Sequence, residues 1–139
     1  MGYNKEEITT FAFEKGYTTW DFFEMLKVKN EKEYAATLHG IFFGNTLEYT
    51  YFCDQVSLND TRYIAKRNCS ITITPEKLEK MVDEGSNKID LLRFFGITGT
   101  IKLYRKLNNI FGDDEKRYLA FRKKLDKNTT KFINSDTRS

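Results

Sequence analysis

The side chains best suited to chemistry in this chain are its one histidine and its two cysteines. His39 could act as a general base, but catalysis would also need an orienting carboxylate and a nucleophile, and the spacing around His39 supplies neither. Cys53 and Cys69 have no histidine near them, whereas a zinc site normally requires four nitrogen or sulfur ligands. We therefore expect a structural histidine, two reduced cysteines in or near the core, and no bound metal.

Two acidic pairs are the other candidates for binding a cation. Glu31 and Glu33, and likewise Asp113 and Asp114, stand where a helical pattern begins. Acidic side chains are favourable near helix N-termini, so both pairs are interpreted as helix starts or caps. The eight glycines are scattered and form no phosphate-binding loop. The chain is therefore expected to be no enzyme and to bind no cofactor.

Basic residues are concentrated in the second half of the chain. The net charge is +3 overall, but residues 1–75 carry −2 and residues 76–139 carry +5. Residues 102–131 alone carry +6. Such a concentration attracts phosphate groups, which makes nucleic acid a candidate partner. An ordinary solvated helix surface with an excess of lysine is the alternative that the charge leaves open.

Length and hydropathy restrict the class of protein further. A chain of 139 residues forms one domain or two very small ones, and 15% aromatic residues supply material for a core. The N-terminal segment lacks a basic stretch followed by a long apolar one, so no signal peptide is expected. No apolar run approaches the roughly 20 residues that span a bilayer. The expectation is a cytoplasmic protein with no membrane partner.

Apolar periodicity and capping residues predict seven helices. They cover residues 5–15, 20–27, 31–43, 75–84, 88–95, 100–111 and 115–125. The strongest start is Thr74-Pro75, because a hydroxyl cap is followed by proline at the first helical position. Between the third and fourth helices, residues 47–53 alternate with a period of two, which predicts a strand. A turn at 58–60 and a return strand at 62–66 complete a β-hairpin, and residues 70–73 form another short β-prone run.

The helical parts of the chain show an internal duplication. A shift of 69 residues aligns residues 7–43 with 76–112 without a gap, and Gly16 then pairs with Gly85. Most apolar positions are kept, although Ile8 pairs with a lysine. The other mismatches are Phe11 with Lys80 and Lys32 with Ile101. Any two amphipathic helical stretches can be brought into partial register, and that alternative stays open.

Each copy resembles a helix-turn-helix unit of the winged-helix or three-helix type, and the second copy matches better. Its segment is IDLLRFFGITGTIKLYRKL, residues 89–107. Phe95 ends a support helix, Gly96 makes the turn, Ile97 fills the core, and Thr98 opens the next helix, as in that family. The resemblance implies that residues early in the next helix face the major groove. These are Thr98, Gly99, Thr100, Lys102 and Arg105, with Lys106 nearby.

The resemblance also assigns roles to the remaining basic residues. The hairpin takes the place of a wing, whose basic edge suits contacts with the phosphate backbone. The backbone contacts are assigned to Arg62, Lys66, Arg67, Lys116, Arg122 and Lys123. The first copy, residues 20–38, has Lys27 instead of the turn glycine, and Glu31 and Glu33 would repel phosphate. We therefore expect only the second copy to recognise DNA.

The predicted fold class is mainly α with a β-hairpin, an α+β protein with two duplicated three-helix units flanking the wing-like hairpin. The domains are a first unit at 1–45, the hairpin connection at 46–73, a second unit with a C-terminal helix at 74–127, and a flexible tail at 128–139. The predicted function is that of a DNA-binding regulator.

The first copy is rich in phenylalanine and holds more large aromatic residues than three helices easily bury. These residues must therefore be buried either in a core shared with the hairpin or in an interface.

The alternative function is a non-enzymatic inhibitor that binds another protein. The composition, rich in Lys, Asn, Ile and Phe, and the small size resemble proteins of bacteriophages and mobile elements, among them anti-defence inhibitors such as anti-CRISPR proteins. A host protein or a second copy of the chain, as a homodimer, would then be the partner.

Overall fold

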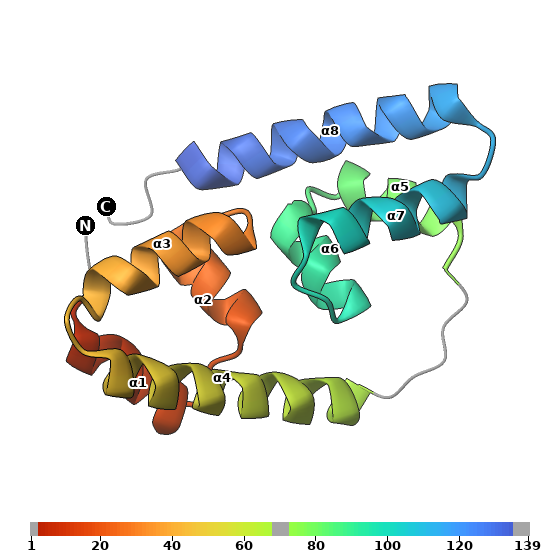
Figure 1. The fold of residues 1–139 in the computed structure, drawn as a ribbon. Coiled ribbons are helices and arrows are strands. Elements are labelled where there is room, and N and C mark those ends of the chain that lie inside the picture. Colours follow the sequence, from red (N-terminus) through yellow and green to blue (C-terminus); the bar gives the residue numbers. More distant parts are fainter. Residues whose placement is uncertain (1–2, 68–72, 135–139) are drawn as a thin grey trace. The chain divides into compact units, whose positions relative to one another are not determined.

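All regular structure in the described part of the chain is helical. The structure is a computed structural model that describes residues 3–67 and 73–134, and it forms two units, residues 1–69 and 70–139. The first unit contains α1 (Lys5–Phe13), α2 (Thr19–Leu26), α3 (Glu31–Ile41) and α4 (Thr46–Arg67). The second contains α5 (Pro75–Asp83), α6 (Lys88–Phe95), α7 (Thr100–Phe111) and α8 (Glu115–Asn134). Each unit thus has three short helices followed by a long one (Figure 1).

The predicted β-hairpin is wrong, and with it the α+β class. Residues 46–67 form the helix α4, and the described residues contain no strand. Asn45 begins this helix, because its Oδ1 accepts from the Glu48 amide at 3.2 Å. The inward residues Phe52 and Val56 follow helical spacing and are 1% and 3% exposed. Residues 70–72 of the other β-prone run lie outside the described residues.

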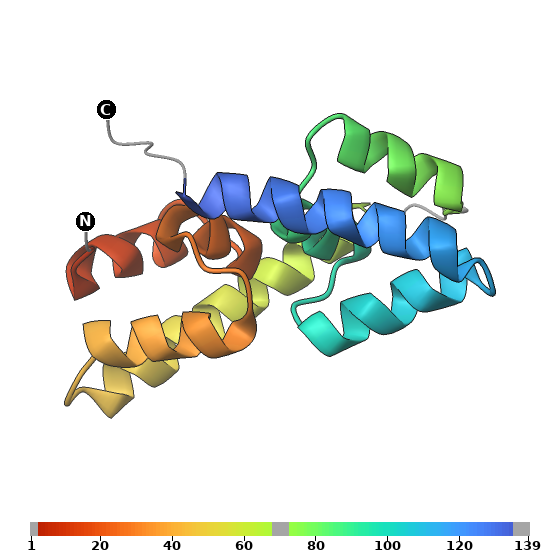
Figure 2. The same cartoon turned by 90° about the horizontal axis from the view of Figure 1, so that it is seen from above.

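The core of the first unit is aromatic and uses the long helix. Phe22 and Phe42 lie against Phe52 of α4, with ring centroids 5.2 Å apart in both pairs. α4 packs against α1 and α2, and the helices of this unit are coloured from red to yellow-green in Figures 1 and 2. The fourth helix therefore takes part of the phenylalanine excess, but Phe13 and Phe43 remain 49% and 89% exposed.

The core of the second unit is mainly aliphatic. α8 packs against all three short helices of its unit. It contributes Phe121 and Leu125, which are 2% and 0% exposed. Phe121 lies against Phe111 of α7 with ring centroids 4.9 Å apart. Because α8 continues to Asn134, part of the predicted flexible tail at 128–139 is helical, while residues 135–139 lie outside the described range.

The two units correspond helix by helix, with one residue of difference in the first loop. Ile8 corresponds to Leu78 and both are 0% exposed, which is a shift of 70 residues rather than 69. From the loop glycines Gly16 and Gly85 onward the shift is 69. The extra residue before Gly16 explains why an ungapped alignment placed lysines opposite Ile8 and Phe11.

In both units an asparagine joins the long helix to the first loop, and it is buried in the first unit and half-buried in the second. In the first unit, Asn59 Nδ2 donates to the carbonyl oxygens of Ala12 at 2.9 Å and Tyr17 at 2.8 Å. In the second, Asn128 Nδ2 donates to the corresponding carbonyls, those of Val82 at 2.8 Å and Ser86 at 2.9 Å. A distant helix thus supplies donors to carbonyl groups at the ends of α1 and α5 and in the loops that follow them.

The residue after this asparagine in each long helix contacts the start of the second helix of its unit. Asp60 accepts from the Thr19 amide at 2.7 Å and from the Thr19 hydroxyl at 2.5 Å. Burial raises the pKa of Asp60, while these two hydrogen bonds oppose the rise. In the second unit the Thr129 hydroxyl accepts from the Lys88 amide at 2.9 Å. The same connection is therefore made by a carboxylate in one unit and a hydroxyl in the other.

The turn after the second helix is left-handed in both units. Gly96 has φ 71° and Lys27 has φ 57°, and Lys27 is the only non-glycine residue with positive φ among those described. Two amide-to-carbonyl bonds close each turn, including Val28 to Phe23 at 3.1 Å and Ile97 to Leu92 at 3.0 Å. The chain thus forms the same turn with and without glycine.

Replacing Lys27 by glycine is expected to stabilise the first unit by up to about 1 kcal/mol. A residue with a side chain costs about 1–2 kcal/mol in the left-handed region, and glycine avoids this cost. Glycine also loses about 0.5–1 kcal/mol more backbone freedom on folding, which offsets part of the gain. Trp20 is the only tryptophan and is 1% exposed, so its fluorescence during urea unfolding reports on this unit. Lys29→Gly, at a residue without positive φ, should lower the midpoint instead, and a lower midpoint for Lys27→Gly would contradict the argument.

Candidate nucleic-acid interface

The segment that resembles a helix-turn-helix is built from α6, a short turn and α7. Asn87 begins α6 through a capping box with Asp90, and the left-handed Gly96 ends it. Gly99 is the residue before α7, and Leu103 and Leu107 hold α7 in the core with 0% exposure. The opposite face of α7 is left to solvent.

The exposed face of α7 carries three cations and no acid. Lys102, Arg105, Lys106 and Asn109 are all exposed and follow one another at intervals of three, one and three residues, which places them on one side of the helix. The helix contains no aspartate or glutamate. Within the described residues none of the three cations forms an ion pair, so their charges are available to a ligand.

The two predicted threonines are less accessible than these cations. Thr98 and Thr100 are both half-buried. The hydroxyl oxygen of Thr100 is buried and has no hydrogen-bond partner in the described part of the chain. The first turn of α7 has neither a side-chain cap nor an acidic residue. Its backbone N–H groups therefore add to the positive end of the helix without competition from a carboxylate.

The cations of α8 divide into paired and free ones. Lys116 and Lys123, both predicted for backbone contacts, are exposed. Arg122 is half-buried: its guanidinium lies 3.9 Å from the Tyr104 ring centroid and donates to the Tyr118 hydroxyl at 3.2 Å. Arg122 therefore packs α8 onto α7 and is not a free phosphate ligand.

Acidic residues of α5 neutralise two further cations of α8. Arg117 donates to Glu79 at 2.8 Å and to Glu76 at 2.7 Å. These hydrogen bonds lower the pKa values of both carboxyls, and the pairs with Arg117 are the leading cause. Lys124 pairs with Asp83 at 2.9 Å. The charge excess of the region from residue 102 to 131 is therefore smaller at the surface of α8 than the sequence indicates.

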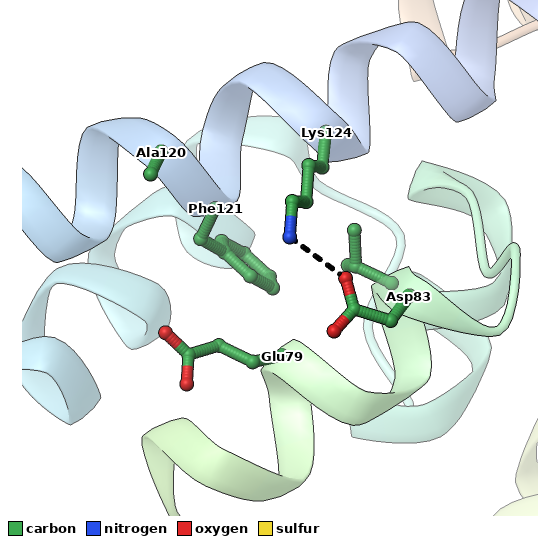
Figure 3. A pocket seen from close by; sticks show the side chains of 6 residues that line it. Glu79, Asp83, Ala120, Phe121 and Lys124 are labelled. Carbon is green, nitrogen blue, oxygen red and sulfur yellow. Dashed lines mark hydrogen bonds and ion pairs between the residues drawn. The ribbon is translucent and has the colours of Figure 1, made fainter.

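A hollow of about 250 Å³ lies between α5 and α8 (Figure 3). Its floor is Phe121, and Lys124 reaches across it to Asp83. Glu79 lines the hollow as well and is bound to Arg117. Because Lys124 pairs with Asp83 and Glu79 pairs with Arg117, the charged groups that line the hollow are all paired.

The remaining predicted cations belong to the first unit. Arg62 and Lys66 are exposed on α4, and Arg67 is the last residue of that helix. The segment predicted to form the wing, residues 47–66, belongs to the helix α4. The structure thus brings together Lys102, Arg105 and Lys106, but it places Arg62, Lys66 and Arg67 in a different unit.

The third helix of the first unit lacks the basic face. The positions of α3 that correspond to the exposed stripe of α7 hold Glu33, Ala36, Thr37 and Gly40. The first copy therefore lacks basic residues along the whole of this helix face, and not only at Glu31 and Glu33 in its first turn. Asn109 and its corresponding Gly40 were missed as members of this face, although their helical spacing could have included them.

The cluster of His39, Tyr49 and Cys53 shows no sign of activation. The His39 ring lies 4.9 Å from the Tyr49 ring, and Cys53 hydrogen-bonds to Tyr49. Burial raises the pKa of the Cys53 thiol, which keeps it protonated and a poor nucleophile. Cys69 lies outside the described residues. Among the residues that are described, no group of three metal-binding side chains comes together.

Comparisons with known proteins identify no relative. No family model matches the chain, no curated protein is similar to it, and no solved structure matches its fold. Within the described residues, no helix has the length and apolar character needed to cross a membrane.

Proposed function

We propose that the second unit binds DNA through the exposed face of α7. The observation that carries this proposal is the uninterrupted basic stripe of Lys102, Arg105 and Lys106 on a helix without acidic residues. Cations spaced along one helix face can contact successive phosphates or base edges of a groove. The glycine turn before α7 supports the same interpretation, because it sets α7 against α6 as in a helix-turn-helix unit.

Within this proposal the basic residues have different roles. Lys102 and Arg105 lie nearest the start of α7 and contact base edges or the adjoining phosphates, since that end of a recognition helix enters the groove. Lys106, one position further, and the exposed Lys116 and Lys123 of α8 contribute general attraction to the backbone. Arg122 positions α8 through Tyr104 and is not assigned to DNA.

The double variant Lys102→Ala, Arg105→Ala is expected to weaken DNA binding and to flatten its dependence on salt. Loss of two phosphate contacts should reduce the slope of log affinity against log salt by about 2. Fluorescence anisotropy with a labelled random duplex, titrated at several salt concentrations, measures both the affinity and the slope.

A matched control separates a local effect from a change of net charge. Lys15→Ala, Lys32→Ala removes the same charge from exposed positions of the first unit and should leave the slope nearly unchanged. Equal losses in both double variants would show non-specific attraction and contradict the assignment to α7. Absence of binding by the wild-type chain at low salt would reject the proposal and favour the alternative, an inhibitor that binds another protein.

A further inference from the structure

The outer face of α4 carries an apolar stripe that has no place in the core. Leu47, Tyr51 and Leu58 are 63%, 58% and 44% exposed, and the exposed Asp54 lies between the last two. These four residues, the α4 stripe, follow one another at intervals of four, three and four. This is the spacing of the contact seam between two packed helices. A soluble helix surface gains nothing from such an arrangement unless another surface covers it.

The corresponding stripe of the second unit has the opposite character. The shift of 69 places Lys116, Ala120, Lys123 and Lys127 of α8 at the positions of the α4 stripe. All four are exposed, and three of them carry a positive charge. The shared fold therefore does not require apolar residues at these positions, and the α4 stripe needs a reason of its own.

We propose that two copies of this chain associate through their α4 stripes, with the two helices antiparallel. In the register that pairs the seam positions, Leu47 of each copy packs on Leu58 of the second copy. Tyr51 then lies beside Asp54 of the second copy, where its hydroxyl can donate to the carboxylate. An antiparallel two-fold arrangement makes every such contact twice.

The composition of the stripe favours a second copy over a different protein. When two copies of the stripe are placed antiparallel, a leucine lies on a leucine at both ends of the contact. In its middle, Tyr51 of each copy lies beside Asp54 of the other. Neither the Tyr51 nor the Asp54 side chain has a hydrogen bond or an ion pair among the described residues, so both side chains are available for this contact. A parallel arrangement would place Asp54 next to Asp54 and would be repulsive.

The same register extends the contact beyond α4. Phe43, in the turn before α4, is 89% exposed and lies four residues before Leu47. It is brought towards Arg62 of the second copy, an exposed cation without an ion pair in the described part of the chain. A guanidinium against an aromatic face is a favourable pair at an interface. The most exposed aromatic residue of the chain is thereby covered as well.

Analytical ultracentrifugation of the full chain without nucleic acid tests the proposal. The wild type is expected to be a dimer at micromolar concentration. Leu47→Glu and Leu58→Lys should each raise the dissociation constant of the dimer by about a hundredfold or more, because each buries two unpaired charges. Circular dichroism and Trp20 fluorescence check that both variants remain folded, and Leu119→Glu, at a 58% exposed leucine of α8, is the matched control that should stay dimeric.

Mixing the two variants tests the register itself. In an antiparallel pair, Glu at position 47 of one chain faces Lys at position 58 of the other, while the second contact keeps both leucines. The mixture should therefore form a heterodimer although each variant alone is monomeric. A monomeric wild type, or a dimer that Leu47→Glu and Leu58→Lys leave intact, would overturn the proposal, and a mixture that stays monomeric would overturn the antiparallel register. Because no DNA is present, these results do not depend on the function proposed for α7, and Lys102→Ala, Arg105→Ala should remain dimeric.

Discussion

Asn59→Ala is expected to lower the stability of the first unit by about 2–4 kcal/mol, because two carbonyl groups lose their only buried donor. The Asn59 side chain is 5% exposed, and its Nδ2 bonds to Ala12 and Tyr17 at 2.9 and 2.8 Å. Alanine at this position removes the donor from both oxygens, and the contact with Ala12 is buried while that with Tyr17 is half-buried. Asn59→Asp should be at least as costly, since it keeps the size of the side chain but turns an acceptor towards the two oxygens.

The two units provide a control for each other in this experiment. Urea unfolding is followed by Trp20 fluorescence for the first unit and by far-UV circular dichroism for both units. Asn59→Ala should shift the tryptophan transition, whereas Asn128→Ala should shift only the dichroism transition of the second unit. A tryptophan transition that Asn59→Ala leaves in place would show that the two hydrogen bonds contribute little. A shift of equal size in the tryptophan transition of Asn128→Ala would show that the units do not unfold separately.

The short helices could be predicted from the sequence because each has local signals at its ends. Thr74 caps α5, Asn87 caps α6, and the left-handed Gly96 ends α6. Each of these signals involves only a few neighbouring residues of the chain. Capping and apolar periodicity act over one or two turns, so they need no knowledge of the fold. The seven helices predicted outside the hairpin are all present, and their ends differ by few residues except in α8.

The helix α4 was missed because apolar residues on more than one of its faces give the alternation expected of a strand. Leu47, Tyr49 and Tyr51 alternate with polar residues, and β-branched and aromatic side chains favour a strand by propensity. Its buried residues Phe52 and Val56 follow a helical period, but the exposed apolar residues conceal that period in the sequence. Tertiary contacts of the buried face therefore decide the conformation against the local preference.

The internal duplication contained the information that could have corrected this error. Extended past residue 43, the same shift of 69 pairs Tyr49 with Tyr118, Phe52 with Phe121, and Asn59 with Asn128. Residues 115–125 were already predicted to be helical, so the pairing would have assigned a helix to residues 46–56 as well. The two asparagines are the most informative pair, because an amide kept at corresponding positions among apolar residues indicates a shared tertiary contact.

The candidate site could be predicted only where it depends on one helix. Helical spacing alone places Lys102, Arg105 and Lys106 on the solvent side of α7. The position of Arg122 depends on Tyr104, a residue of another helix, and the neutralisation of Arg117 depends on α5. Contacts between helices distinguish free cations from paired ones, and no pattern within a single helix contains them.

Phe52→Ala is expected to destabilise the first unit by about 4–5 kcal/mol, near the upper end of the range for a buried aromatic residue. Phe52 is 1% exposed and is enclosed by Phe22 and Phe42 at 5.2 Å. The two surrounding rings are held on α2 and at the end of α3, so they can move little into the space that the lost ring leaves. The tryptophan transition should shift to a much lower urea concentration or disappear.

Phe121→Ala, at the corresponding position of the second unit, should cost less, about 3 kcal/mol. Phe121 is 2% exposed, but it borders the hollow between α5 and α8, so water and the neighbouring side chains can enter the space more easily. Thermal unfolding followed by circular dichroism measures the loss, and Leu119→Ala, at an exposed position of the same helix, should change the midpoint little. If Phe121→Ala proved the more costly of the two, the hollow would not relieve the cavity, and the core of the second unit would have to be the more rigid one.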